Sequence, residues 1–241
     1  MQLKDKRALV TGAAGGIGAA IVSRLQAEGA VVTGTDRLPS KAEFHIDGDL
    51  MDAGFCDRLP YEAADQMGGL DILINNAGII TRGDITQASD DDLKRSMAIN
   101  VEAPFRLCRA AIPLMVQAGG GAIVNTSSCW GVHPGPNHPI YVMSKAAIAS
   151  LTQCLGMDHA HQNIRVNAVC PNEVNTPMIR TGFEARGLDP DKAIDELNAS
   201  VPLGRIAEPE DIADVVLFLA SDQSRYMCGA LLEVNGGKPV Q

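Results

Sequence analysis

Short apolar runs alternate along the chain with longer segments in which apolar residues recur every three or four positions. The short runs predict buried β-strands, and the longer segments predict amphipathic helices. The expected strands are residues 7–11, 30–36, 43–46, 70–74, 122–126, 164–170 and 231–234. The expected helices run from a glycine turn at 12–18 to about residue 28, over 53–67 with an interruption at Pro60, over 89–118, 141–157 and 209–221, and over a patch at 190–199. Strands that alternate with helices predict an α/β fold.

One connection is too short for a helix, because parallel strands usually need a dozen or more residues to return. After Asp36, residues 38–41 are therefore expected to cross as an extended loop and to leave that flank of the sheet thinly covered. Residues 179–205 are polar and contain Gly and Pro, so a mobile substrate lid is expected at about 176–205. The absence of repeats, low-complexity tracts and linkers favours a single domain over residues 1–241.

Composition narrows the function classes. The chain of 241 residues has 46% hydrophobic residues and 24 Gly, enough to bury a large core. Its formal net charge of −9 argues against nucleic acid or an anionic membrane surface as a partner. No apolar run is long enough to cross a bilayer, and the first residues lack the apolar core of a signal peptide, so a soluble cytoplasmic protein is expected. The six cysteines are scattered, without Cys-x-x-Cys pairs or groupings with histidine, which predicts reduced, mostly buried thiols and no metal site.

The first predicted strand ends in a glycine-rich turn that opens a helix. This layout lets the backbone approach a pyrophosphate, and the helix N-terminus offers it unpaired N–H groups. Glycine is also common in tight turns for conformational reasons alone. The position of this turn at the start of a βαβ unit nevertheless favours a dinucleotide site.

Asp36 ends the second predicted strand, roughly twenty residues beyond the glycines. An aspartate there can accept both ribose hydroxyls of NAD and would repel the additional phosphate of NADP. Arg37 follows directly, and an arginine in this region can pair with that phosphate. On balance the acid favours NAD over NADP. Asp47 and Asp49 are candidates for contact with an adenine amine.

Tyr141 and Lys145 stand four positions apart at the start of a predicted helix, so their side chains share one helix face. A cation near the phenol favours the phenolate and would draw the tyrosine pKa down from about 10 towards neutrality. Tyr141 is therefore a candidate general acid/base. Taken alone, the spacing also fits a tyrosine packed on a lysine stem. Ser128 follows a predicted strand, where open α/β sheets place ligand groups, and its hydroxyl could hold a substrate oxygen.

Several motifs occur together, namely Thr11-Gly-x-x-x-Gly-Ile-Gly18, Asn75-Asn-Ala-Gly78, Asn100, Ser128 and Tyr141-x-x-x-Lys145. In order and spacing they resemble the signature of the classical short-chain dehydrogenases/reductases, over essentially the whole chain. The gap of thirteen residues before Tyr141 selects Ser128 rather than Ser127 as the serine. The resemblance implies a single-domain Rossmann-type three-layer αβα sandwich with a mainly parallel seven-stranded sheet. It also implies a homotetramer or homodimer built on the long helices.

The resemblance further implies roles for single residues. Tyr141 would exchange the proton with the substrate oxygen, Lys145 would lower its pKa and hold the nicotinamide ribose, and Ser128 would steady the oxygen. Asn100, which on its own suggests only an exposed or packing residue of a long helix, would anchor a water in a proton relay. The residues that match the family's cofactor contacts are Gly12, Gly16, Ile17, Gly18, Asp36, Asp49, Leu50, Asn76, Ala77, Gly78, Tyr141, Lys145, Pro171, Val174 and Thr176.

Three features depart from the common family pattern. The chain has Pro171-Asn172 where Pro-Gly is usual; asparagine tolerates the left-handed backbone, so the turn can survive while the side chain enters the site. Asn235 replaces an aspartate before two glycines near the C-terminus. The missing crossover helix after Asp36 resembles a subset of the family that includes some diol dehydrogenases.

The substrate side is expected to be polar. In this fold it is lined by the loop before Tyr141, the segment after Pro171 and the lid. The candidates there are His133, Asn137, His138, Asn172, Glu173 and Arg180, with Asn175 and Arg186 beside them. A steroid-like substrate would leave such groups dehydrated and unpaired, at roughly 1–3 kcal/mol each. A small polyol, sugar, sugar acid or diol is expected instead, with an arginine available for a carboxylate.

Two alternatives remain open at this stage. An NADPH-dependent 3-ketoacyl reductase would share the same reaction centre, but Asp36 disfavours its cofactor. A catalytically silent dinucleotide-sensing protein would bind the cofactor without turnover. The presence of Asn100, Ser128, Tyr141 and Lys145 argues against it, because a silent protein has no chemical need for all four.

Overall fold

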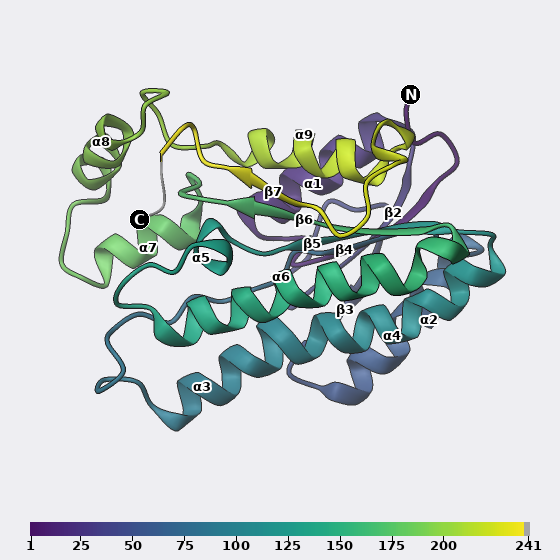
Figure 1. Ribbon diagram of the computed structural model, residues 1–241, viewed down its shortest axis with the longest axis horizontal. Coiled ribbons are helices and arrows are strands. Elements are labelled where there is room, and N and C mark those ends of the chain that lie inside the picture. The colour runs from purple at the N-terminus through teal and green to yellow at the C-terminus, as the bar shows by residue number, and fades with distance from the viewer. Residues whose placement is uncertain (239–241) are drawn as a thin grey trace.

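The computed structural model describes residues 1–238, and its centre is a seven-stranded sheet (Figure 1). The strand order is β3-β2-β1-β4-β5-β6-β7, and every neighbouring pair is parallel, which confirms the expected parallel sheet. The strands are β1 (Arg7–Thr11), β2 (Val31–Asp36), β3 (Phe44–Asp47), β4 (Ile72–Asn75), β5 (Gly121–Thr126), β6 (Ile164–Pro171) and β7 (Leu231–Val234).

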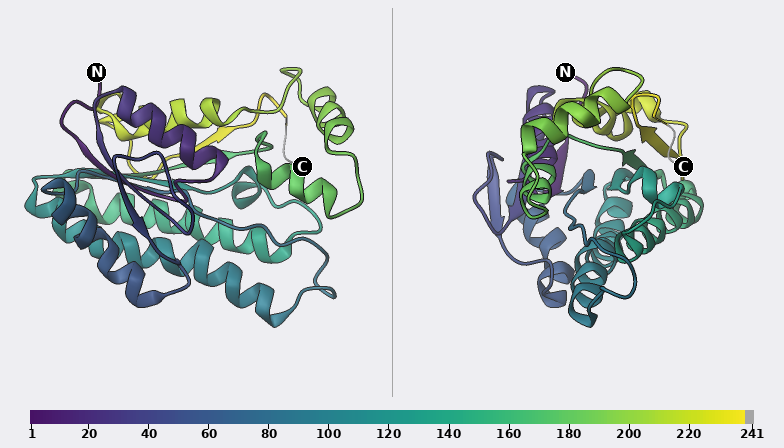
Figure 2. Two further views of the ribbon diagram at one scale, coloured as in Figure 1. Left: turned by 180° about the vertical axis from the view of Figure 1, so that it is seen from behind. Right: turned by 90° about the vertical axis from the view of Figure 1, so that its left-hand side faces the viewer.

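Helices cover both faces of this sheet and complete the three-layer αβα sandwich (Figures 1 and 2). The α-helices are α1 (Gly16–Ala27), α2 (Ala53–Met67), α3 (Asp90–Met97), α4 (Ala103–Gln117), α5 (Cys129–Val132), α6 (Pro139–His159), α7 (Pro177–Glu184), α8 (Pro190–Ser200) and α9 (Pro209–Ala220). Helices α1 and α9 pack together on one face, and α2, α4 and α6 lie on the other. No helix among residues 1–238 is long and apolar enough to span a bilayer.

Two apolar clusters fill the space between the layers. Successive side chains of a strand point to opposite faces, so Val10 of β1 belongs to the cluster under α1 and α9, whereas Leu9 belongs to the cluster under α2 and α4. The first cluster includes Ile21 and Val216, and the second includes Met115. The core therefore fixes the sheet from both sides.

The crossing from β2 to β3 contains no helix, as its length predicted. Strand β2 ends at Asp36 and the next element is β3, which begins at Phe44 and pairs with β2 in parallel. Strand β3 forms one edge of the sheet.

Two expectations about the long helices were wrong. Pro60 does not interrupt α2, which runs unbroken from Ala53 to Met67. Burial of Phe55, Leu59 and Ala63 against the sheet offsets the hydrogen bond that a proline cannot donate. The helix expected over residues 89–118 is divided by a π-helical segment, Ala98–Glu102, between α3 and α4.

Proline provides a physical reason for that division. Pro104 has no N–H to donate to the carbonyl oxygen of Asn100, four residues earlier, so an unbroken α-helical ladder cannot form at this point. The result is that Asn100 lies in an irregular turn and is only 1% exposed.

The segment expected to be a lid holds two helices rather than one. Besides α8, residues Pro177–Glu184 form α7, which the polar composition of this segment concealed. Ile179 and Phe183 of α7 pack with Ile194 of α8 and with Val201 in a separate small apolar cluster. Figure 1 shows α7 and α8 at the same end of the molecule as the starts of α3 and α6.

Candidate active site

A cavity of about 320 Å³ opens at the carboxyl ends of the central strands. Thr126 ends β5 and Pro171 ends β6, and both line it, as does Asn76 directly after β4. The other predicted site residues in its lining are Ile17, Gly78, Ser128, His138, Tyr141, Lys145, Asn172, Glu173, Val174 and Thr176. The topology thus brings together residues from most of the chain at one end of the sheet.

Lys145 lies one helical turn after Tyr141 in α6, and its ammonium is 5.8 Å from the centroid of the phenol ring. Its side chain is buried, and Nζ donates a hydrogen bond of 2.8 Å to the Thr126 carbonyl oxygen. Burial lowers the pKa of Lys145 to about 8. The ammonium is therefore held beside the tyrosine by the end of β5.

The surroundings of Tyr141 change one expectation. Burial raises the pKa of Tyr141 above its usual value, while the Ser128 hydroxyl and the positive charge of Arg82 act in the opposite direction. The pKa of Tyr141 is thus raised overall rather than lowered as predicted, because desolvation of the phenol outweighs the effect of the cations beside it. Arg82 is a cationic neighbour that the sequence pattern did not reveal.

Ser128 is fixed at the start of the short helix α5. Its Oγ accepts a hydrogen bond of 3.2 Å from the Trp130 N–H as the helix cap, and it lies 3.4 Å from the Pro171 carbonyl oxygen, to which it can donate. These contacts hold the hydroxyl between the ends of β5 and β6, where a substrate oxygen can reach both it and the Tyr141 phenol.

Asn100 stands behind the cavity rather than in its lining. Its Nδ2 donates to the Ile79 carbonyl oxygen at 2.9 Å and to Ser144 Oγ at 3.0 Å, and its Oδ1 accepts from the Ile79 N–H at 2.9 Å. Ile79 itself lines the cavity. A Cβ on Gly78 would come within 3.2 Å of Lys145 Nζ and 3.4 Å of Asn100 Oδ1, so the segment after β4 packs closely against both side chains.

The glycine turn between β1 and α1 fits a dinucleotide pyrophosphate. Gly12 has a φ of +67°, and a Cβ on Gly18 would collide with the Gly12 carbonyl oxygen. Gly16 approaches Thr176, where an added Cβ would lie 2.9 Å from the threonine methyl group. Helix α1 begins without a side-chain cap, so its first N–H groups point towards this turn and are available to an anion.

Asp36 lies beside the same turn at the end of β2. Its carboxylate accepts hydrogen bonds from the N–H groups of Ala14 at 3.1 Å and Leu38 at 3.2 Å. Asp49 is exposed and accepts from the Met51 N–H at 3.0 Å, with Leu50 between them. This arrangement can hold the ribose and adenine of a dinucleotide.

The segment after β4 is tied to the end of β1. Asn76 Nδ2 donates to the Thr11 carbonyl oxygen at 3.0 Å, and the N–H groups of Asn76 and Ala77 each donate to Thr11 Oγ1 at 3.1 Å. These bonds place Gly78 opposite the glycine turn and form one wall of the cavity.

Three of the six candidate substrate residues do not line the cavity. His133 is exposed, and its Nε2 lies 3.1 Å from Glu233 Oε1. Asn137 is exposed in a left-handed turn with a φ of +62°. Arg180 forms an ion pair of 2.8 Å with Asp191. These three residues occupy loop and helix positions whose side chains point away from the cavity. The sequence pattern could not show this direction.

The other three do line the cavity. His138 packs against Trp130 with ring centroids 4.6 Å apart and the ring planes tilted by 47°, and its Nδ1 donates to the Pro136 carbonyl oxygen at 2.9 Å. Glu173 is paired with Lys238 at 2.7 Å. Asn172 follows β6 directly.

Arg186, which was expected on the substrate side, also lines the cavity. Further lining residues escaped the sequence-based reasoning about the substrate: Trp130, Met178, Ile179, Phe183 and Leu197, which make part of the wall apolar, and Arg82. Ile179 and Phe183 recur at helical spacing, which is a signal for α7. Arg82 belongs to no motif.

Burial raises the pKa of the nearby Cys129 and Cys170 thiols to about 12, so neither is a thiolate nucleophile at neutral pH.

Comparisons with known proteins agree with this geometry. A family model described as enoyl-(acyl carrier protein) reductase matches residues 12–238. The chain is 38% identical to a trans-4-hydroxycyclohexanecarboxylate dehydrogenase of Sinomonas cyclohexanicum, over 98% of this chain and 94% of that protein. It is 36% identical to a 3α-hydroxysteroid dehydrogenase of Mediterraneibacter gnavus, over 98% of each.

A solved structure gives the same result. The ligand-free aldohexose dehydrogenase of Thermoplasma acidophilum superposes with a TM-score of 0.93 at 33% identity, over 99% of this chain and 96% of that one. Family members of this kind are oxidoreductases that act on alcohols and ketones with a nicotinamide cofactor. Since sequence, sheet topology and the arrangement around Tyr141 agree along nearly the whole length, the chain belongs to the classical short-chain dehydrogenase/reductase family.

Proposed function

We propose that this protein is an NAD-dependent dehydrogenase that transfers a hydride between nicotinamide and a secondary alcohol or ketone. The observation that carries the proposal is one cavity lined by Ser128, Tyr141 and Lys145 and bordered by the residues of the glycine turn and of the segment after β4. No group of three or more His, Cys, Asp or Glu side chains among residues 1–238 is placed to hold a metal ion.

The chain's own residues would move the proton. The bound cofactor supplies the hydride acceptor or donor. In oxidation, the Tyr141 phenolate accepts the proton of the substrate hydroxyl while the Ser128 hydroxyl donates a hydrogen bond to the same oxygen. Lys145, whose pKa is about 8, is charged at neutral pH and favours the phenolate electrostatically. Asn100 positions Ile79 and Ser144 behind this centre.

Asp36 supports NAD as the cofactor. The carboxylate is oriented by the N–H groups of Ala14 and Leu38, and its charge opposes a phosphate on the ribose. Arg37 is exposed at the adjacent position. The alternative of an NADPH-dependent 3-ketoacyl reductase requires the opposite preference, and a catalytically silent sensor requires no turnover, so both are separable by kinetics.

The substrate is proposed to be a small hydroxylated compound: a polyol, a sugar, a sugar acid or a diol. His138 and Asn172 offer hydrogen bonds, and Trp130 offers an apolar face on which the carbon side of a ring can lie. Two of the similar proteins have names that specify substrates of this kind, an aldohexose and a hydroxycyclohexane carboxylate. The name of the similar steroid dehydrogenase points to a competing class of substrate, the steroids, for which the apolar wall of the cavity would be the binding surface.

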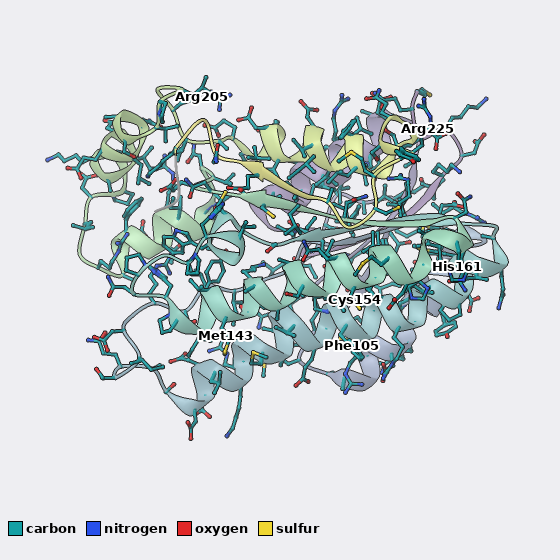
Figure 3. The ribbon with its side chains drawn as sticks, viewed as in Figure 1. Phe105, Met143, Cys154, His161, Arg205 and Arg225 are labelled. Atoms are coloured by element: carbon teal, nitrogen blue, oxygen red, sulfur yellow. The ribbon has the colours of Figure 1, made fainter. Side chains whose placement is uncertain are left out.

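A lid and an oligomer complete the proposal. Helices α7 and α8, within residues 176–205, would close over the substrate, since Ile179, Phe183 and Leu197 line the cavity. A homotetramer or homodimer in the cytoplasm would be built on α4 and α6. Figure 3 shows Phe105 on α4 and Met143 on α6, and both side chains are exposed. Apolar groups on neighbouring long helices are typical of an interface.

The experiment that tests the proposal is NADH formation by the purified protein with NAD⁺ over polyols, aldoses, sugar acids, diols, and aliphatic and steroid alcohols. Turnover of the hydroxylated compounds is expected. Tyr141→Phe should abolish turnover and leave the Kd for NADH near its original value, because only the phenol oxygen is lost. Turnover retained in that variant contradicts the proton-transfer role, and turnover of steroids alone contradicts the substrate class.

A further inference from the structure

Two guanidinium groups stand at the edge of the cavity that holds Tyr141. Arg82 comes from the segment between β4 and α3, and Arg186 follows α7; both line the cavity. Neither forms an ion pair with an acid in the described part of the chain. Both arginines remain open to solvent, so a ligand can reach them.

Both groups lie against Gly182 of α7. Arg186 Nε donates a hydrogen bond of 3.0 Å to the Gly182 carbonyl oxygen. The Arg82 guanidinium lies so near the Gly182 Cα that an added Cβ would collide with it. Partial desolvation and, after it, the positive charge of Arg186 lower the pKa of Arg82, although its side chain is still reached by solvent. Two like charges in this position repel each other, and an anion bound between them would remove that repulsion.

The remaining charges of the cavity do not neutralise the pair. Glu173 is the acidic residue in the lining, and its carboxylate is already engaged by Lys238 at 2.7 Å. Lys145 adds a further positive charge at the floor. The cavity is thus cationic in a chain whose formal net charge is −9. A local field of opposite sign to the whole molecule concentrates anions at the site.

We propose that Arg82 and Arg186 bind the carboxylate of the substrate, so that the enzyme acts on hydroxy acids and the corresponding keto acids. This proposal rests on the proposed dehydrogenase function and specifies its substrate. Planar guanidinium forks match the geometry of a carboxylate and bind it with charge-assisted hydrogen bonds. Arg82 and Tyr141 line the same cavity, and the charge of Arg82 acts to lower the pKa of Tyr141. The carboxylate and the reacting hydroxyl would therefore occupy this one cavity. Arg186 lies two residues after the end of α7, so binding would also draw the proposed lid towards Arg82.

The test measures kcat/KM with NAD⁺ for a series of aliphatic and alicyclic hydroxy acids, each paired with its carboxamide. The amide keeps the size and planar shape of the carboxylate but removes its charge and replaces one acceptor oxygen with an NH2 donor, which cannot pair with a guanidinium. The wild-type protein is expected to prefer the acid by roughly ten- to a hundredfold. Arg82→Met and Arg186→Met should each remove most of this preference by lowering the value for the acid. The Kd for NADH should stay unchanged. Arg82→Met also removes a cation that acts to lower the pKa of Tyr141, which affects acid and amide alike, so the acid-to-amide ratio is the quantity that tests the site.

Two further variants separate charge from position. Arg180→Met is the matched control, because Arg180 belongs to the same lid segment but pairs with Asp191 outside the cavity, and it should leave the preference unchanged. Gly182→Ala keeps both charges and places a methyl group against the Arg82 guanidinium. It should reduce the preference for acids without lowering the Tm, since alanine suits a helix better than glycine.

Equal kcat/KM values for acid and amide in the wild-type protein would overturn the proposal. A raised Kd for NADH in Arg82→Met with an unchanged acid-to-amide ratio would also overturn it, because the arginines would then serve the cofactor. If no member of any pair is oxidised, the dehydrogenase proposal fails for these compounds. Binding of the same pairs to the NADH complex, followed by NADH fluorescence, then decides: acid-selective binding lost in Arg82→Met supports the carboxylate site, and unselective binding overturns it.

Discussion

Asn100 and Ile79 are joined by two hydrogen bonds of 2.9 Å that run in opposite directions. The amide side chain pairs with both backbone polar groups of Ile79, as a neighbouring strand would, and a third bond of 3.0 Å reaches Ser144 in α6. The π-helical turn that carries Asn100 thereby connects the segment after β4 to the helix of Tyr141 and Lys145.

Asn100→Ala removes these bonds and leaves the part-buried N–H and carbonyl groups of Ile79 without their side-chain partner, whereas Ser144 Oγ keeps its bond of 2.7 Å to the Tyr141 carbonyl oxygen. The free energy of unfolding is expected to fall by about 2–4 kcal/mol, and kcat should fall because Ile79 and α6 lose their common support. Urea unfolding measures the first effect and steady-state kinetics the second. An unchanged urea midpoint would show that the bonds do not contribute to stability.

Lys145→Met is expected to stabilise the protein while inactivating it. The pKa of Lys145 falls from 10.5 to about 8 in the folded chain, which corresponds to a cost of about 3 kcal/mol for carrying the buried ammonium at pH 7. Loss of the bond to Thr126 offsets part of the gain, so an increase of about 1–3 kcal/mol in the free energy of unfolding is expected at pH 7.

The pH dependence of this difference follows from proton binding. Between about pH 8 and 10.5 the unfolded lysine binds a proton that the folded lysine has released, so the stability of the wild-type protein rises with pH across this window. The advantage of the methionine variant should therefore shrink above pH 8. A difference that is constant up to pH 10.5 would contradict the lowered lysine pKa.

Gly18→Ala should damage the dinucleotide turn, whereas Gly15→Ala should not. The new Cβ at Gly18 collides with the Gly12 carbonyl oxygen, but at Gly15 the nearest atom is 3.4 Å away. A loss of about 1–3 kcal/mol is expected for Gly18→Ala, with a raised Kd for NADH. Thermal unfolding and NADH titration of both variants measure this. Equal Tm values would contradict the steric argument.

Asp36→Asn should weaken the preference for NAD over NADP by roughly tenfold or more, because the charge that opposes the ribose phosphate is lost. The measurement is the ratio of kcat/KM for the two cofactors. Asp47→Asn, which removes an exposed acid at the end of β3, is the control and should leave the ratio unchanged. A wild-type protein that uses both cofactors equally would refute the NAD proposal.

The apolar periodicity of the sequence was sufficient to predict the alternating strands and helices of the fold. All seven strands lie within a few residues of the predicted runs. The five central strands are mostly buried on both faces and therefore almost continuously apolar, whereas the edge strands β3 and β7 are only partly buried. The division of the helix at Asn100 was missed because apolar periodicity does not reveal it. It depends on the missing N–H of Pro104, four residues later, which changes the backbone at Asn100. Helix α7 was missed because its apolar side chains are few and pack on α8 rather than on the main core.

Site residues that belong to sequence motifs were predicted more successfully than site residues in loops. Residues in fixed motifs, such as Tyr141 and Thr176, do line the cavity. The loop residues His133 and Asn137 do not, because the direction of a loop side chain depends on turns that composition does not encode. Arg82 could not be found at all, since its proximity to Arg186 arises from the packing of Gly182.

The small apolar cluster under α7 and α8 determines how the segment 176–205 can move. Phe183, Ile194, Val201 and Ile206 bury one another, so the two helices cannot separate without exposing this cluster to water. The segment is therefore expected to open as one rigid body about its ends, where Pro177 and the Gly204 turn begin and finish it, rather than by local melting. Rigid-body opening keeps the hydrogen bonds within both helices, so their amides should stay protected from hydrogen exchange while the segment opens. They should exchange only when the two helices unfold together, with one shared free energy.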